Sequence, residues 1–344
     1  MKTQWILDTH GDPLGTLRQF VSAVWQRAGL QGMLVPKNGS QNTVTEAQLI
    51  KDSGQLDDVN PFKPLMTLNT ANLIPDTLNE NPDSHLGVMM RPCELRALIE
   101  MVKHNGFSTD EVLTICADCL GTFPVEDYGW RANRKGAPGK LTQEALQFAR
   151  QGGISAYRYR SACQVCTAPG ARSAHINIGV LGLPVRQHIL VSARDEGTAE
   201  RLDLDEITDD QASPALLAQH DRMLAKIFER HRRTYEHVVS GLTGVLPENL
   251  DALIEQLHSC ENCQDCLDVC PICVVDHPRR AEDGKYLRED VTRWMISCSG
   301  CGMCEDACPR HLPLNTIFLH IREQLAESYG YSPGHSSREQ LPLM

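Results

Sequence analysis

Two cysteine runs near the C-terminal end constrain this chain more strongly than any other feature of its sequence. Both follow the spacing C-x2-C-x2-C-x3-C-P, and their residues are Cys260, Cys263, Cys266, Cys270 and Pro271 in the first run and Cys298, Cys301, Cys304, Cys308 and Pro309 in the second. A 4Fe-4S cluster needs four thiolates, and three closely spaced cysteines on one loop can surround a corner of that cube. The spacing therefore predicts two 4Fe-4S clusters and a chain that carries single electrons.

The fourth ligand of each cube is expected to come from the other run, because the cysteine before the proline serves the other cluster in two-cluster ferredoxins. We therefore assign Cys260, Cys263, Cys266 and Cys308 to one cube and Cys298, Cys301, Cys304 and Cys270 to the second. The alternative is a pair of structural zinc sites, since C-x2-C pairs also bind zinc. Two complete four-cysteine runs, each closed by proline, favour iron-sulfur clusters.

Three further residues stand within these runs or beside them. Gly300 and Gly302 allow backbone N-H groups to approach the cluster sulfurs closely, which tunes the reduction potential of a cluster. Cys273 adds a fifth thiol to the first run and is either an exchangeable ligand or a small buried apolar residue. The four-cysteine pattern is complete without it, so the buried role is favoured.

The remaining composition fits a cytoplasmic redox protein of anaerobic metabolism. The 14 cysteines among 344 residues are clustered, which favours metal binding in a reducing compartment over disulfides. No segment approaches the ~20 apolar residues that span a bilayer, and residues 1–11 lack the basic and apolar regions of a secretory signal. The net charge of -11 does not indicate the basic surface that nucleic-acid binding requires. We expect a cytoplasmic chain that neither crosses a membrane nor binds nucleic acid.

Alternating helix and strand patterns in the first 200 residues predict an α/β domain with a mixed sheet. Residues 13–29 repeat apolar side chains at a helical period and end at a glycine. The apolar run Leu86–Met90 predicts a strand that leads through a turn at Cys93 into a helix, and residues 112–116 predict a strand that leads toward Cys119. Because ligands bind beyond the carboxyl ends of strands in open α/β sheets, both cysteine loops are expected at one edge of the sheet.

Five cysteines lie outside the two runs, and their polar turns suit a third metal site better than core filling: Cys93, Cys116, Cys119, Cys163 and Cys166. The alternative is a mixture of small buried residues with a zinc knot. The motifs around these cysteines are Arg91-Pro92-Cys93, Cys119-x-Gly121-Thr122 and Cys163-x2-Cys166, followed by the stretch 176–182. Over most of residues 11–192 this pattern resembles the beta subunits of coenzyme F420-reducing hydrogenase and of formate dehydrogenase, a family of flavin and iron-sulfur electron-transfer subunits.

The resemblance implies a third 4Fe-4S cluster beside an FAD. Carried over residue by residue, it implies the ligands Cys93, Cys119, Cys163 and Cys166. Cys116 is left as a spare whose role is exchangeable with that of Cys119.

The sequence indicates the residues that would contact a flavin less directly. The glycine-rich turn of the family is only partly kept at residues 11–15, and no G-x-G-x-x-G fingerprint occurs. Arg91 is a candidate to neutralise a pyrophosphate or a reduced flavin, or else an ordinary surface arginine. Gly179 and Gly182 are candidates for close backbone approach to the flavin, or else mark a bulge in a strand.

The domain organisation follows from these assignments. We predict an α/β flavin and iron-sulfur domain over residues 1–200 and a linker with a bridging helix over 201–245, the helix covering residues 214–239 and a flexible link covering 203–213. A small α+β ferredoxin-type domain with two clusters is predicted over 246–328, and a loose tail over 329–344.

The function predicted from these features is electron relay. Two electrons enter or leave as hydride at FAD, and the clusters exchange them singly with a partner chain. The sequence has no evident formate or hydrogen site and no assigned catalytic residue, so we expect a catalytic dehydrogenase, hydrogenase or heterodisulfide-reductase-like partner subunit. The candidates for the two-electron substrate are a deazaflavin, a nicotinamide or another compound, and the sequence does not choose among them. The alternatives are a flavin-free polyferredoxin-type relay with no substrate of its own and a cluster-based sensor or structural protein.

Overall fold

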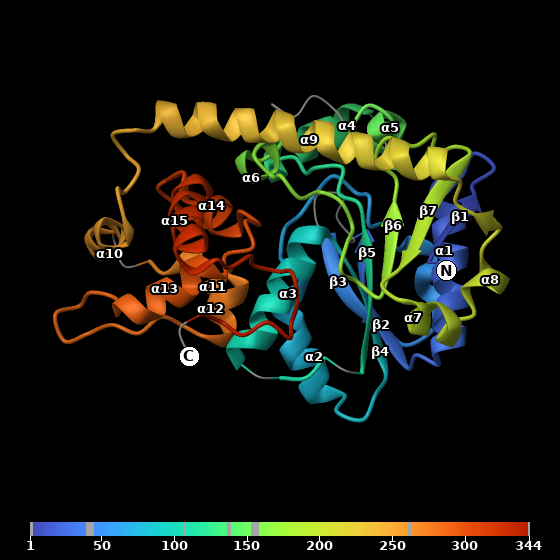
Figure 1. The fold of residues 1–344 in the computed structure, drawn as a ribbon, viewed down its shortest axis with the longest axis horizontal. Helices are drawn as coiled ribbons and strands as arrows, with labels where there is room; N and C mark the ends of the chain where they lie inside the picture. Colours follow the sequence, from blue (N-terminus) through green and yellow to red (C-terminus); the bar gives the residue numbers. More distant parts are fainter. Residues whose placement is uncertain are drawn as a thin grey trace.

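The computed structural model describes residues 3–38, 45–105, 107–109, 111–135, 139–152, 158–260 and 263–342. Figure 1 shows an α/β body built on one sheet and a helical C-terminal body beside it, with the long helix α9 (Pro214–Gly241) running across both. The strands are β1 (Gln4–Asp8), β2 (Gly32–Asn38), β3 (Thr45–Ile50), β4 (Leu86–Met90), β5 (Val112–Ala117), β6 (Ile176–Gly179), β7 (His188–Ala193) and β8 (Asp210–Gln211).

The helices alternate with these strands and then continue without them. In the α/β body they are α1 (Pro13–Ala28), α2 (Ile74–Glu80), α3 (Pro92–Asn105), α4 (Val125–Lys135), α5 (Gly139–Ala149), α6 (Ser161–Gln164), α7 (Glu196–Arg201) and α8 (Leu204–Ile207), with short 3-10 helices at Ser53–Asp58 and Thr70–Leu73. After α9 follow α10 (Leu250–Ser259), α11 (Asp265–Asp268), α12 (Pro271–Val275), α13 (Arg288–Ile296), α14 (Met303–Ala307) and α15 (Leu314–Tyr329). Within the described residues, no helix is both long and apolar enough to cross a membrane.

The sheet is mixed, in the order β3-β2-β4-β5-β6-β7-β1-β8. Its centre is parallel, because β2, β4, β5 and β6 pair in parallel, while the flanking pairs are antiparallel. β4 and β5 run in register from Leu86 beside Val112 to Met90 beside Cys116. Their carboxyl ends therefore meet at one edge, which confirms the expectation for the two cysteine loops.

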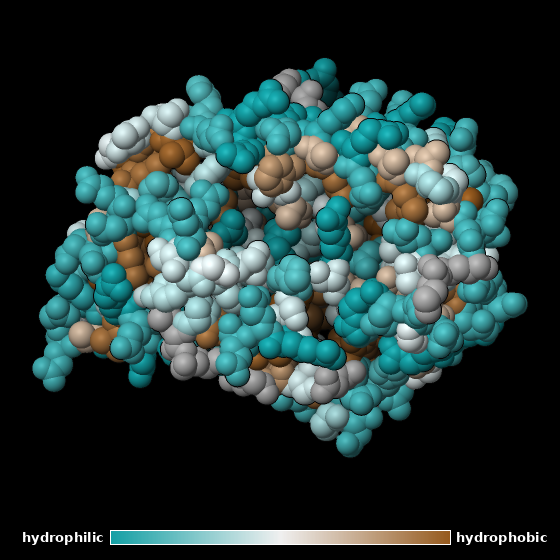
Figure 2. All heavy atoms as spheres, in the orientation of Figure 1, coloured by the Kyte–Doolittle hydropathy of each residue, from teal (hydrophilic) through white to brown (hydrophobic). Residues whose placement is uncertain are grey.

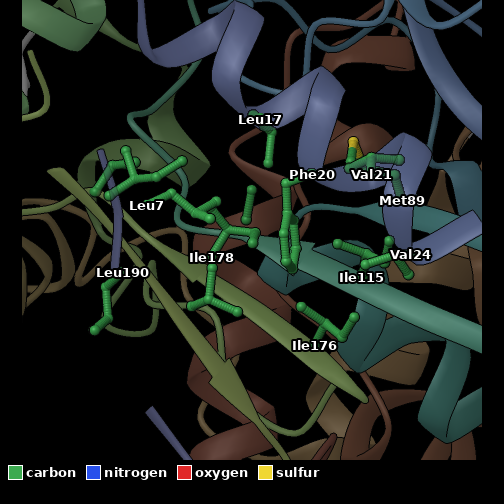
Figure 3. Close-up of a cluster of buried hydrophobic side chains, with 14 of the residues drawn as sticks. Leu7, Leu17, Phe20, Val21, Val24, Met89, Ile115, Ile176, Ile178 and Leu190 are labelled. Atoms are coloured by element: carbon green, nitrogen blue, oxygen red, sulfur yellow. The ribbon is translucent and has the colours of Figure 1, made fainter. Parts of the chain in front are cut away.

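Helices on both faces explain why the central strands are buried and mainly apolar. Every residue of β4 and β5 is buried, as parallel strands covered on two sides should be. Figure 3 shows Phe20 and Val24 of α1 pointing onto Ile115 and Ile176 of the sheet. The other face packs on α3, whose buried residues include Leu98. The predicted helix at residues 13–29 is confirmed, and a left-handed Gly29 ends it.

The α/β body and the C-terminal helices share one apolar core. The buried cluster that holds Leu98 of α3 also holds Ile272, Trp294 and Phe318 of the C-terminal body. Helix α12 packs against α3, and α15 packs against α9. The ferredoxin-type module is therefore docked on the sheet domain through side chains of both.

Two predictions about loose segments are wrong. The polar stretch 203–213 contains α8 and β8, and β8 extends the sheet by pairing Gln211 with Trp5. The Trp5 indole also donates to Asp205 at 2.8 Å, so this stretch is part of the α/β body. In the tail, Tyr331 is buried and its hydroxyl donates to Glu100 at 2.6 Å. In both segments, contacts with buried residues elsewhere in the chain produce an ordered structure that the local composition did not predict.

His175, which comes just before β6, gives the sheet a pH dependence. Its Nδ1 accepts the backbone N-H of Thr114 at 3.1 Å, and its own N-H donates to Thr114 Oγ1 at 3.0 Å. Burial, with Arg194 and Arg201 next, lowers the pKa of His175 from 6.5 to about 4. The unfolded histidine binds a proton at higher pH than the native one, so this contribution to stability is complete above about pH 6.5 and falls as pH drops toward 4.

Replacing His175 by asparagine should remove that dependence, because the amide oxygen can accept the same N-H without titrating. Between about pH 7.5 and 5.5 the wild type should lose ~1 kcal/mol more unfolding free energy than His175→Asn. Urea unfolding of the cluster-loaded protein at both values measures this, with the exposed His237→Asn as the control. Equal losses in wild type and His175→Asn contradict the assignment.

Candidate iron-sulfur sites

The first ferredoxin-type site, called the outer site here, is formed by the four cysteines assigned to the first cube. Cys260, Cys263, Cys266 and Cys308 line a single cavity. Apolar side chains of α10 and α15 form much of its wall, among them Leu253 and Phe318. The cysteine before Pro309 thus joins the first run, as the crossed assignment expects.

The second site, called the inner site, gathers Cys298, Cys301, Cys304 and Cys270. Burial raises the pKa of Cys304 well above its ordinary value, and its neighbours Cys298, Cys301 and Cys270 raise it further because thiolates repel one another. Cys266 of the outer site adds to the same effect, which places the two sites side by side. Such buried thiols become thiolates when a metal binds them.

Cys273 is a buried residue that contacts a ligand position. It lies on α12, is 3% exposed and belongs to the apolar core. A hydrogen bond from the Cys273 side chain, with one from the Trp294 side chain, lowers the pKa of Cys270 to about 7 despite burial. The buried role expected for Cys273 agrees with this position.

A third cavity lies where the α/β body meets the inner site, and we call it the junction cavity. Cys301 of the inner site lines it, together with four cysteines of the α/β body, Cys93, Cys119, Cys163 and Cys166. They come from the start of α3, the loop after β5, and α6 with the loop that follows it. Burial and then the nearby Cys163 raise the pKa of Cys119 to about 12.

Cys116 takes no part in this cavity. It lies on β5, is fully buried and packs within the apolar core between the sheet and α3. Strand alternation explains the difference, because Cys116 faces the core whereas Cys119 follows the end of the strand. The structure thereby separates the two cysteines that the resemblance left exchangeable.

Two buried arginines make the junction cavity suitable for an anionic group. Arg91 Nη2 donates to the carbonyls of Lys63 and Leu65 at 3.0 and 2.8 Å. Arg160 Nη2 donates to the carbonyl of Cys301 at 3.1 Å, and its Nε lies 2.6 Å from Asp306. Arg160 Nη1 is buried without a hydrogen-bond partner among the described residues, although the side chain lines the cavity.

These observations fit a 4Fe-4S cluster in the junction cavity. Four thiols, two buried cations and an unpaired donor match a thiolate-held anion. No group of three or more Cys, His, Asp or Glu side chains in the described residues converges on a single ion position.

The junction cavity and the inner site share a wall. Gly300 and Cys301 line the cavity as well as belonging to the second cysteine run. Gly302 has a φ of +72°, and a Cβ there would lie 2.3 Å from the Cβ of Ala162 on α6. Glycine at this position thus permits close packing of α6 on the inner loop, in addition to the role expected from the sequence.

Sequence reasoning missed Arg160 and the α9 residues of the junction cavity. His231 lines the cavity, and its Nδ1 donates to the carbonyl of Cys166 at 2.7 Å. A signal was present, because His220, Leu224, Ile227 and His231 share one face at helical spacing and all are buried. A polar residue within an apolar stripe of a helix indicates that its side chain has a specific hydrogen-bond partner.

The three residues predicted to contact a flavin have other partners. Gly182 has a φ of +80°, and a Cβ there would lie 2.6 Å from the Cβ of Met223 on α9. A Cβ on Gly179 would lie 3.1 Å from His220. Arg91 is held by carbonyl oxygens and lines the junction cavity. Both glycines thus accommodate α9, and neither lines the cavity.

Asp118 fixes the loop that carries Cys119. Its Oδ2 accepts from the backbone N-H groups of Val180 and Leu181 at 2.8 and 3.0 Å, and its Oδ1 accepts from Ala171 at 2.7 Å. His220 Nε2 of α9 lies 2.8 Å from Oδ2. Although burial opposes the charge, Asp118 raises the pKa of His220 above its ordinary value. The Asp118 carboxylate therefore connects the end of β5 to two loops and to α9.

Comparisons with known proteins agree with this arrangement. Residues 259–312 match the 4Fe-4S dicluster domain family. The F420-dependent formate dehydrogenase subunit beta of Methanocaldococcus jannaschii is 47% identical over 38 residues, a segment that spans 11% of this chain and only 10% of that relative. A chain of the F420-reducing NiFe hydrogenase complex from Methanosarcina barkeri has the same fold with a TM-score of 0.51 and 11% identity, covering 69% of this chain and 91% of that one.

The resemblance to the beta-subunit family is confirmed. The dicluster match also decides the two cysteine runs in favour of iron-sulfur clusters over zinc. This beta-subunit-like chain is therefore an iron-sulfur protein in which a mixed α/β body carries a C-terminal dicluster module.

Replacing Asp118 by asparagine should destabilise the loop of Cys119. The amide keeps the size of the carboxylate but leaves a buried N-H donor facing other donors, which should cost about 2–3 kcal/mol of unfolding free energy. Urea unfolding measures this loss. Asp221→Asn is the matched control, because that carboxylate lies on the same helix as His220, is 70% exposed and should change stability by less than ~0.5 kcal/mol. Equal losses in the two variants contradict the role given to Asp118.

Proposed function

We propose that this chain is an electron-transfer subunit of a multi-subunit oxidoreductase, with 4Fe-4S clusters in the junction cavity, the inner site and the outer site. The observation that carries this proposal is the shared wall, since Cys301 and Gly300 belong to the inner site and line the junction cavity. When bound, such clusters supply one-electron transfer. The chain's own residues hold the clusters in sequence and exclude water between them.

Arg160 has a defined part in this proposal. The residue is 3% exposed, and its guanidinium lies between the junction cavity and the carbonyl of Cys301. A buried cation there reduces the electrostatic cost of gathering thiolates on both sides. The ion pair with Asp306 fixes the position of the guanidinium.

The outer site is the proposed contact point for a partner. Cys263 is the exposed cysteine among the four that line it, whereas Cys308 is buried. By analogy with the formate dehydrogenase relative and the hydrogenase complex, we propose a catalytic dehydrogenase, hydrogenase or heterodisulfide-reductase-like partner subunit. We place the complex in the cytoplasm, because clustered, unpaired cysteines suit a reducing compartment.

An FAD would link single-electron transfer to a hydride carrier such as a deazaflavin or nicotinamide. Of the residues predicted to hold it, Gly179 and Gly182 accommodate α9 and do not fit that role, and Arg91 lines the junction cavity that is assigned here to a cluster. No step is therefore assigned to a flavin. This packing favours the flavin-free relay as the second candidate function.

Analysis of iron, acid-labile sulfide and flavin in the protein purified without oxygen tests the proposal. Three cubes predict about twelve iron and twelve sulfide per chain, whereas the dicluster module alone predicts about eight of each. One FAD per chain identifies the flavoprotein form, and none identifies the flavin-free relay.

A pair of cysteine variants tests the ligand assignment in the junction cavity. Cys119→Ser should lose about four iron atoms per chain, because one of four thiolates is removed. Cys116→Ala should keep all of its iron, since that side chain packs in the core. Iron content and electron paramagnetic resonance (EPR) spectra of the reduced proteins give the comparison. Full iron in Cys119→Ser, or the loss of four iron atoms in Cys116→Ala, contradicts the assignment.

A further inference from the structure

Trp294 makes a polar contact with one assigned ligand of the inner site. Its indole N-H donates to Cys270 Sγ at 3.3 Å. The side chain is 2% exposed, and Phe318 packs edge-on against the ring with centroids 5.1 Å apart. The packing fixes the direction of the N-H, and the thiol is its partner inside the core.

A second donor reaches the same sulfur. Cys273 lies on α12, three residues after Cys270, and its side chain hydrogen-bonds Cys270. Cys273 is buried within the shared core, where water does not compete for the contact. Two side chains from different helices therefore converge on one ligand atom.

The equivalent ligand of the outer site lacks these donors. Cys308 also precedes a proline, but no tryptophan is among the described residues that line its cavity. The position that corresponds to Cys273 is His311, which is exposed. The two runs have the same spacing, but Cys270 and Cys308, the ligands that each run is assigned to supply to the other cube, have different surroundings.

We propose that Trp294 and Cys273 are positioning residues that raise the reduction potential of the inner cube by donating hydrogen bonds to its ligand Cys270. Reduction adds negative charge that is shared with the ligand sulfurs, so donors to a sulfur stabilise the reduced cluster more than the oxidised one. Electrons that reach the chain then settle on the inner cube, beside the junction cavity. This inference rests on the dicluster module and the crossed assignment of Cys270, and it does not require the third cluster.

The variant Trp294→Phe removes the donor and keeps an aromatic ring. In a redox titration followed by EPR, we expect the reduction equilibrium of one cube to fall about tenfold, which is 59 mV for a one-electron couple. The other cube should keep its potential, and the iron content should stay at the wild-type value. Cys263→Ser, at an exposed ligand of the outer cube, identifies which signal is which. The control is Trp5→Phe, because that buried indole donates to Asp205 in the α/β body.

Two substitutions at Cys273 test the second hydrogen-bond donor, whose side chain is smaller than that of Trp294. Cys273→Ala should lower the potential of the same cube, and Cys273→Ser, which keeps a hydroxyl donor, should restore most of it. The proposal is overturned if Trp294→Phe and Cys273→Ala leave both potentials unchanged with full iron, or if both cubes shift equally. A wild-type content of about eight iron with the inner shift intact would instead remove the third cluster alone.

Discussion

The gathering of thiolates from separate elements into buried sites is the constraint on which this structure depends. Each site brings several like charges into an apolar interior, which costs free energy unless metal and nearby donors offset it. The offsets are specific: Arg160 lies beside the junction cavity and the inner site, and Trp294 donates to Cys270. Arg160 also joins the α/β body to the C-terminal helices through Cys301 and Asp306. Cluster binding and domain docking therefore depend on the same contacts.

The sheet supplies the rigid side of this arrangement. Parallel pairing of β4 with β5 brings the residues after both strands to one edge, and Asp118 then ties that edge to α9. Helix α9 carries His231 to the cavity and also packs on α15. Helix α9 is thus packed against both the α/β body and the C-terminal helices. Electron transfer between the two bodies requires such a fixed arrangement.

Local signals made much of this predictable. Cysteine spacing grouped the four cysteines that line the outer cavity, because ligand spacing follows directly from cluster geometry, and apolar periodicity located α1, β4 and β5. The sequence did not predict β8 or the ordered Tyr331, because their partners lie far away in the chain. Arg160 was missed for the same reason: its role follows from Cys301 and Asp306, about 140 residues later.

The shared wall between the junction cavity and the inner site can be tested most directly by magnetic interaction between clusters. In the fully reduced protein, EPR should show the inner-cube signal split or broadened by a neighbouring paramagnetic cluster other than the outer cube. The extra interaction should vanish in Cys119→Ser while the coupling between the inner and outer cubes remains. A spectrum with only the interaction between the two ferredoxin-type cubes, unchanged in Cys119→Ser, would contradict the account.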